Sequence, residues 1–192
     1  SNVTKAKKAV KFTKAELAGV PDGMLTREGI KTGDDEYTIM VNVTWQYLMV
    51  MENAKSEDVR KRLETERYNL ARETNVALLE QVVALRDKIA RKLGYASWAD
   101  YQIEPKMAKT GAKALGFLKE TSTGLQPKFD AEKAEFQALK AKDTGMANPP
   151  LYVWDWRYYA NQLKKEKYNV DAEQLRVFFP YEKALDGMCK IY

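Results

Sequence analysis

The feature that most constrains the fold is an apolar periodicity between Ser56 and Gly94. Apolar side chains recur there every three or four residues, at Leu78, Val82, Leu85, Ile89 and Leu93. This spacing places them on one face of an α-helix. Ser56 is a suitable N-cap and Gly94 a suitable C′ residue, so we predict one continuous helix between them, the longest of the chain. Core packing explains the stripe, and nothing in it indicates a cofactor groove.

Helical patterns also precede and follow this segment. A helix is predicted from Thr44 to an interruption at 53–56, and Ser97 starts another helix that Pro105 closes. Heptad spacing over 115–139 predicts two packed helical turns or a long hairpin arm, with a kink or break near Gly124 and Pro127. The charged residues of this stretch are interpreted as its solvated face: Lys133, Glu135, Lys140 and Lys142.

The C-terminal part begins with a loop rich in Gly, Asn and Pro over 143–150. An aromatic-rich helix is predicted over about 151–167, Asp171 caps a short helix, and Pro180 occupies the first turn of a last one. Cys189 lies in the apolar pattern of that last helix. We predict a buried structural thiol, since the chain has no histidine to lower the pKa of a nucleophilic one.

The start of the chain is less regular. Thr13 and Glu16 form a capping-box pattern and predict a short helix, which Gly19 and Pro21 end. Aromatic and β-branched residues over 37–43 predict the one short strand or extended segment. The sequence therefore predicts a mainly α protein: a lysine-rich, irregular start over 1–43, then a helical bundle over 44–192 whose last helix pattern runs to the final residue and is interpreted as truncated.

Charge and composition exclude several classes of function. The net charge of +5 is concentrated in lysines before residue 15, which indicates a solvated tail and no nucleic-acid partner. The apolar runs are too short to cross a bilayer and no export signal is visible, so we expect no membrane partner and a soluble protein. The compartment stays open, with the cytoplasm favoured over the periplasm. Carboxylate pairs such as Glu64 and Glu66 are interpreted as surface ion pairs.

An aromatic cluster is the one unusual motif. Trp154, Asp155, Trp156, Tyr158 and Tyr159 place four aromatic rings around one acid within six residues. Packing in the core or between domains is the favoured explanation, and contact with a ligand is the alternative.

Three segments in order resemble one known family, the zinc-dependent oligopeptidases that include thimet oligopeptidase, neurolysin, oligopeptidase A and dipeptidyl carboxypeptidase. The sharpest is similar to that family's W-D-x-x-Y-Y helix and the L-R-x-Y-F-P segment after it: Trp154, Asp155, Tyr158, Tyr159, Leu175, Arg176, Phe179 and Pro180. A second, Leu93-Gly94-Tyr95 with Lys106-Met107-Ala108, resembles L-G-Y and K-M-A. The third, over 16–21, resembles E-L-A-G-L-P.

The resemblance implies a parent enzyme that hydrolyses short peptides in a channel between two helical domains, through zinc-bound water. The family's H-E-x-x-H helix and later glutamate ligand lie downstream of this segment, so no catalytic or metal residue carries over to this chain. It implies part of the upper helical domain, a wall of the cleft, and a catalytic domain in cis as partner. Trp154, Asp155, Tyr158 and Tyr159 would line the cleft or the domain junction. The alternative is a non-catalytic helical protein-interaction domain.

Overall fold

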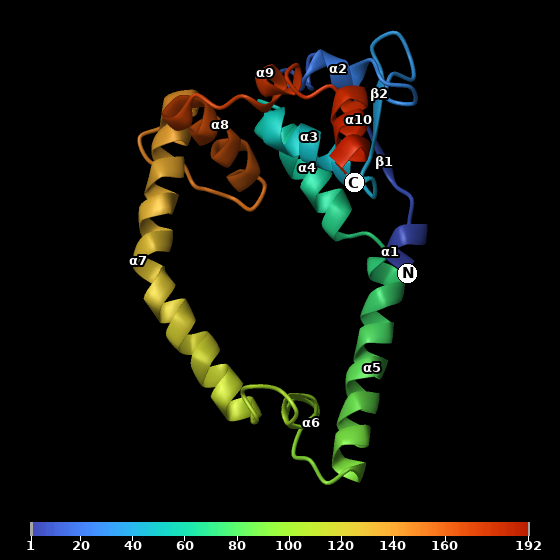
Figure 1. Ribbon diagram of the computed structural model, residues 1–192, viewed down its shortest axis with the longest axis vertical. Coiled ribbons are helices and arrows are strands. Elements are labelled where there is room, and N and C mark those ends of the chain that lie inside the picture. Colours follow the sequence, from blue (N-terminus) through green and yellow to red (C-terminus); the bar gives the residue numbers. More distant parts are fainter. Residues whose placement is uncertain (1, 192) are drawn as a thin grey trace. The chain divides into compact units, whose positions relative to one another are not determined.

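A computed structural model describes residues 2–191 and confirms a mainly α protein (Figure 1). In chain order the elements are α1 Asn2–Lys5, β1 Ala9–Phe12, α2 Asp22–Leu25, β2 Tyr37–Met40, α3 Thr44–Asn53, α4 Glu57–Tyr68, α5 Arg72–Lys92, α6 Trp98–Ile103, α7 Gly111–Thr144, α8 Trp156–Tyr168, α9 Ala172–Arg176 and α10 Tyr181–Ile191. No helix within residues 2–191 is both long and apolar enough to cross a membrane.

The chain divides into two compact units. Residues 7–68 and 136–191 form what we call the sheet unit, because it contains both strands. Residues 2–6 and 69–135 form the long-helix unit, which contains α5, α6 and most of α7. Within the sheet unit, α3 packs against α4, α8 and β2.

The sheet unit contains two strands where the sequence predicted at most one. β1 pairs with β2 in antiparallel register, from Ala9 opposite Met40 to Phe12 opposite Tyr37. Lys11 and the lysines before β1 hid the strand, because they disguise the alternation in which Phe12 is buried and Lys11 is exposed. Part of the predicted solvated tail therefore forms a β-strand.

The predicted helix after Thr13 is wrong, although its cap is present. The backbone N–H of Thr13 donates to Glu16 Oε2 at 2.7 Å, and the backbone N–H of Glu16 donates to Thr13 Oγ1 at 3.2 Å. Only turns follow, and Gly19 takes φ +96. A Cβ at that position would lie 2.4 Å from the Asn53 carbonyl oxygen, so only glycine lets the turn pack this closely.

The long helix predicted between Ser56 and Gly94 is two helices. Ser56 caps α4 as predicted, accepting from the Val59 N–H at 3.4 Å, and Gly94 ends α5 with φ +84. Between them Ala71 takes the left-handed conformation, φ 57, which ends the run of helical hydrogen bonds. The apolar stripe of α5 is exposed, not packed in a core: 47% at Leu78 and 57% at Leu85.

The break or hairpin predicted near Pro127 is also absent. α7 is a single helix of 34 residues, the longest of the described chain, with Pro127 inside it. A proline removes one backbone hydrogen bond, and the turns on both sides are long enough to continue the helix past it.

The last part of the chain follows the predicted order with a shifted start. Residues 151–155 are not helical, and α8 begins at Trp156. Asp171 caps α9 as predicted, accepting from the Glu173 N–H at 3.0 Å. The prediction of a buried Cys189 is wrong: its side chain is exposed, on a helix whose apolar residues are also exposed.

Candidate functional site

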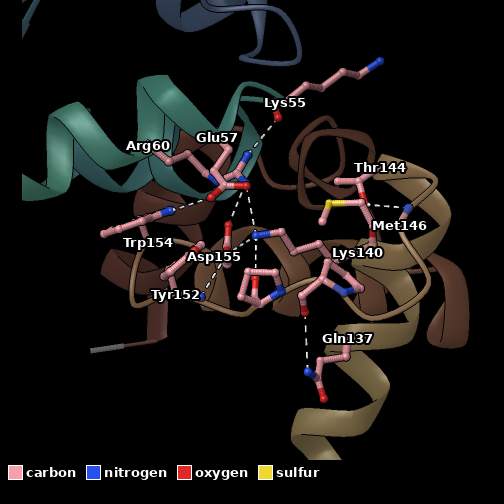
Figure 2. A network of polar contacts seen from close by, with 12 residues as sticks. Lys55, Glu57, Arg60, Gln137, Lys140, Thr144, Met146, Tyr152, Trp154 and Asp155 are labelled. Atoms are coloured by element: carbon pink, nitrogen blue, oxygen red, sulfur yellow. Dashed lines mark hydrogen bonds and ion pairs between the residues drawn. The ribbon is translucent and has the colours of Figure 1, made fainter.

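A buried carboxylate organises the sheet unit at the start of α8. Asp155 is fully buried, and Figure 2 shows it at the centre of a polar network. Its Oδ1 accepts from Arg60 Nη2 at 2.9 Å. Its Oδ2 accepts from Lys140 Nζ at 2.7 Å and from the Tyr152 N–H at 3.0 Å. Both oxygens of this carboxylate are therefore occupied by donors.

The two cations have further partners. Arg60 Nη1 donates to the Ala54 carbonyl at 2.7 Å and to the Lys55 carbonyl at 2.9 Å, while its buried Nε has no partner among the described residues. Lys140 Nζ donates to the Pro150 carbonyl at 2.8 Å and pairs with Glu57 at 2.9 Å. We call Glu57, Arg60, Lys140 and Asp155 the Asp155 cluster.

The charges of the Asp155 cluster balance, with two cations and two carboxylates. Burial alone would lower the pKa of Lys140, but the hydrogen bonds that Lys140 donates to Asp155 and Glu57 outweigh burial and raise it. Lys140 therefore stays protonated in the folded protein at neutral pH. Breaking such a buried group is costly, since any member left alone is an uncompensated charge.

Aromatic rings surround the cluster. Trp154 Nε1 donates to Glu57 Oε1 at 3.1 Å, and the Trp154 ring stacks on Tyr152 with 4.7 Å between centroids. The Arg60 guanidinium lies 4.4 Å from the centroid of Tyr158, which meets Tyr159 edge to face. Trp154 and Asp155 are thus both hydrogen-bonded to α4, through Glu57 and Arg60, which lie about one helical turn apart.

Local sequence explains how the cluster forms. Glu57 and Arg60 lie in the first turn of α4, three residues apart and on one face. Lys140 lies one turn after Phe136 on α7, so it shares the face that packs against Tyr158 and Tyr159. The non-helical turn before α8 then points Asp155 between α4 and α7. The cluster therefore joins the start of α4, the end of α7 and the start of α8. The Asp155 carboxylate at its centre is enclosed.

A second buried pair lies nearby in the sheet unit. The Tyr47 hydroxyl donates to Glu64, and Arg67 lies 4.3 Å from the Tyr47 ring. Burial and the Glu64 carboxylate raise the pKa of Tyr47. The interpretation of Glu64 as a surface residue is wrong, because it is 6% exposed. Glu66 does pair with Lys8 at the surface, as predicted for it.

The structure places three of the four predicted site residues in the interior: Asp155, Tyr158 and Tyr159. Trp154 is half-buried at the edge of the cluster. Sequence reasoning missed Arg60 and Lys140, and it wrongly assigned Lys140 to the solvated face. The available signal was position: Lys140 follows Phe136 by four residues and Leu139 by one, on the apolar face of α7.

The chain's own residues do not fit a zinc site. It has no histidine among 192 residues. Within residues 2–191, no three Cys, Asp or Glu side chains gather as a metal site would require. Asp155 and Glu57 are instead taken up by cations.

Comparisons with known proteins give a consistent result. The sequence model of Peptidase family M3 matches residues 50–192. Saccharolysin of Saccharomyces cerevisiae is 36% identical over 199 residues, covering 100% of this chain and 28% of that protein. Oligopeptidase A of Escherichia coli is 28% identical over 188 residues, covering 92% of this chain and 27% of its own length. A probable thimet oligopeptidase of Arabidopsis thaliana is 29% identical, covering 94% and 25%. The chain thus spans about a quarter of these relatives.

Proposed function

Because the chain belongs to peptidase family M3, we propose that it is part of a zinc-dependent oligopeptidase that hydrolyses short peptides. In this proposal the chain forms a wall of the substrate cleft, and the zinc ligands and catalytic base lie elsewhere in the protein. The family match over 50–192 carries the proposal. The absence of histidine supports the division of roles, since this sequence supplies none of the usual nitrogen ligands of zinc.

The Asp155 cluster has a defined part in this proposal. It fixes α8 against α4 and the end of α7, so that the wall keeps one shape while substrate enters and leaves. Asp155, Tyr158 and Tyr159 act from the interior as positioning residues. Trp154, which is half-buried, is the member that would reach the cleft or the domain junction.

The test compares this 192-residue chain with the product of the full reading frame. Zinc content and cleavage of a quenched fluorescent peptide are measured on both. We expect only the longer protein to bind zinc stoichiometrically and to cleave. A longer protein that is metal-free and inert would refute the proposal and favour a non-catalytic helical interaction domain.

A paired substitution tests the role of Trp154 in the longer protein. Trp154→Leu should raise KM with kcat nearly unchanged if the indole contacts substrate. Trp156→Leu is the matched control, because Trp156 lies two residues away and is 49% exposed. Equal KM values for the two variants would contradict a cleft-lining role for Trp154.

A further inference from the structure

The two edges of the small sheet are not equivalent. The Val41 N–H donates to the Lys8 carbonyl, so in this antiparallel register residues 8, 10 and 12 hydrogen-bond to β2. The N–H and C=O groups of Ala9 and Lys11 therefore point away from β2. On β2, the groups of Thr38 and Met40 point away from β1 in the same manner.

The outer edge of β2 is occupied. The Thr38 N–H donates to the Ile30 carbonyl at 2.7 Å, and the Met40 N–H donates to Gln46 Oε1 at 2.6 Å. Among the residues that the structure describes, the outer edge of β1 has one contact of this kind: Arg62 Nη2 donates to the Lys11 carbonyl at 3.2 Å. Within residues 2–191 the outward N–H groups of Ala9 and Lys11 have no acceptor. An open strand edge of this kind is a template for another strand.

This open edge faces a groove of about 470 Å³ between β1 and α4. The volume is within the range of ligand-binding sites, and a strand added to β1 would lie about 4.8 Å from it. The charged residues that line it are Lys11 on β1 and Asp58, Lys61, Arg62 and Glu66 on α4.

The charges in the groove favour an anionic occupant. Its two carboxylates already face cations: Glu66 pairs with Lys8, and Asp58 lies 3.9 Å from Arg62. Two of its cations are likewise paired, Lys11 with Glu36 and Arg62 with Glu16. Lys61 forms no ion pair with any residue of the described chain, and its Nζ lies 5.5 Å from the Trp154 ring centroid.

We propose that the outer edge of β1 binds an extended acidic peptide as a third strand, with a peptide carboxylate paired to Lys61. The peptide backbone accepts from the Ala9 and Lys11 N–H groups and donates to the Ala9 carbonyl, as in other complexes formed by strand addition. This docking site is separate from the proposed hydrolysis and requires no zinc. Its test reads binding by the 192-residue chain, so it succeeds or fails independently of cleavage.

The probe is a fluorescein-labelled, C-terminally amidated peptide of sequence T-V-E-V-T, titrated by fluorescence anisotropy. Saturable binding is expected. Glutamine in place of the probe's glutamate should weaken binding about fivefold, and N-methylation of alternate backbone amides should weaken it about tenfold, since each removes a hydrogen bond or ion pair. Equal binding of all three probes, or no saturation, would overturn the proposal.

Two protein variants locate the site. Ala9→Pro removes only an outward N–H and leaves the β1–β2 ladder intact, so binding should weaken about fivefold; Ala9→Val keeps the donor and should bind as the parent does. Lys61→Ala should abolish the preference for the acidic probe, whereas the exposed Lys164→Ala on α8 should not.

Thermal unfolding checks that each variant is folded. If Ala9→Pro is unstable, the comparison of Lys61→Ala with Lys164→Ala decides whether the peptide binds at this edge. The occupant could instead be a second copy of this chain. Concentration-dependent dimerisation that Ala9→Pro abolishes, without peptide binding, would show this and overturn the peptide proposal.

Discussion

The Asp155 cluster of the sheet unit and the helices of the long-helix unit differ in which kind of side chain they bury. The sheet unit buries charge: Arg60 is 1% exposed and Asp155 is fully buried. The long-helix unit exposes apolar surface, with Leu85 and Phe129 each 57% exposed. Hydropathy alone would predict the reverse. Burial is therefore decided by which segments meet in space, while the sequence pattern decides only which face of a helix each residue occupies.

The same difference separates the energetics of the two units. In the sheet unit the buried charges are held by partners far away in sequence, such as Arg60 and Asp155, and losing one partner leaves the other uncompensated. In the long-helix unit the apolar side chains of α5 face solvent, so little is lost when one is shortened. Substitutions in the two units should therefore differ in cost, and four measurements test this.

The largest effect is expected from Asp155→Ala. It leaves Arg60 and Lys140 buried without their shared carboxylate, which should lower the free energy of unfolding by about 3–5 kcal/mol. Urea denaturation followed by circular dichroism at pH 7 measures it. The control is Asp87→Ala on α5, whose pair with Arg91 is exposed and screened by solvent, so its removal should cost far less. Equal costs for the two variants would mean that the cluster does not stabilise the fold.

A core truncation in the sheet unit should rank next. Leu63 on α4 is fully buried, so Leu63→Ala removes packed atoms and leaves a cavity. The expected loss is about 2–5 kcal/mol, again by urea denaturation. Leu63→Met is the matched control, because it nearly preserves volume and should cost less than about 1.5 kcal/mol. If Leu63→Ala lowers the free energy of unfolding less than Leu63→Met does, the site is not close-packed.

Alkaline pH should weaken the sheet unit selectively. Burial, more than any nearby charge, raises the pKa of Tyr159, so the folded protein keeps this proton at a pH where the unfolded chain has lost it. The stability that the protonated Tyr159 contributes is fully present below pH ~10 and is lost as pH rises above that value. Tyr159→Phe should reduce the fall in stability above pH 10 by up to about 1.4 kcal/mol per pH unit. Between pH 7 and 9 the variant and parent should show the same pH dependence; a difference there would assign the effect to another group.

The sequence predicted local features well and tertiary features poorly. The caps at Ser56, Ser97 and Asp171 are all present, because a cap depends on residues only two or three positions away. The W-D-x-x-Y-Y resemblance located the segment that contains Asp155, and the family match confirms the family. Lys140 was missed because a buried lysine looks like a solvated one until its partner, 15 residues on, is placed beside it.

Strand β1 and the two long helices show the same limit. β1 is stabilised by β2 about 28 residues later, and its own four residues carry a weak signal. The stripe of α5 was correctly read as helical and wrongly read as core, since periodicity does not specify what covers a face. Ala71 ended the predicted long helix although alanine is a strong helix former, so tertiary context overrode propensity at that position.

The smallest effect is expected where the sequence predicted a core. Leu85→Ala on α5 removes a side chain that is 57% exposed and puts in the best helix former, so stability should change by no more than about 0.5 kcal/mol. Urea denaturation of the 192-residue chain measures this beside Leu63→Ala. A loss of 2 kcal/mol or more would mean that the stripe is covered in solution. The melting temperature would then rise with protein concentration if a second copy covers it, because association stabilises only the folded chain.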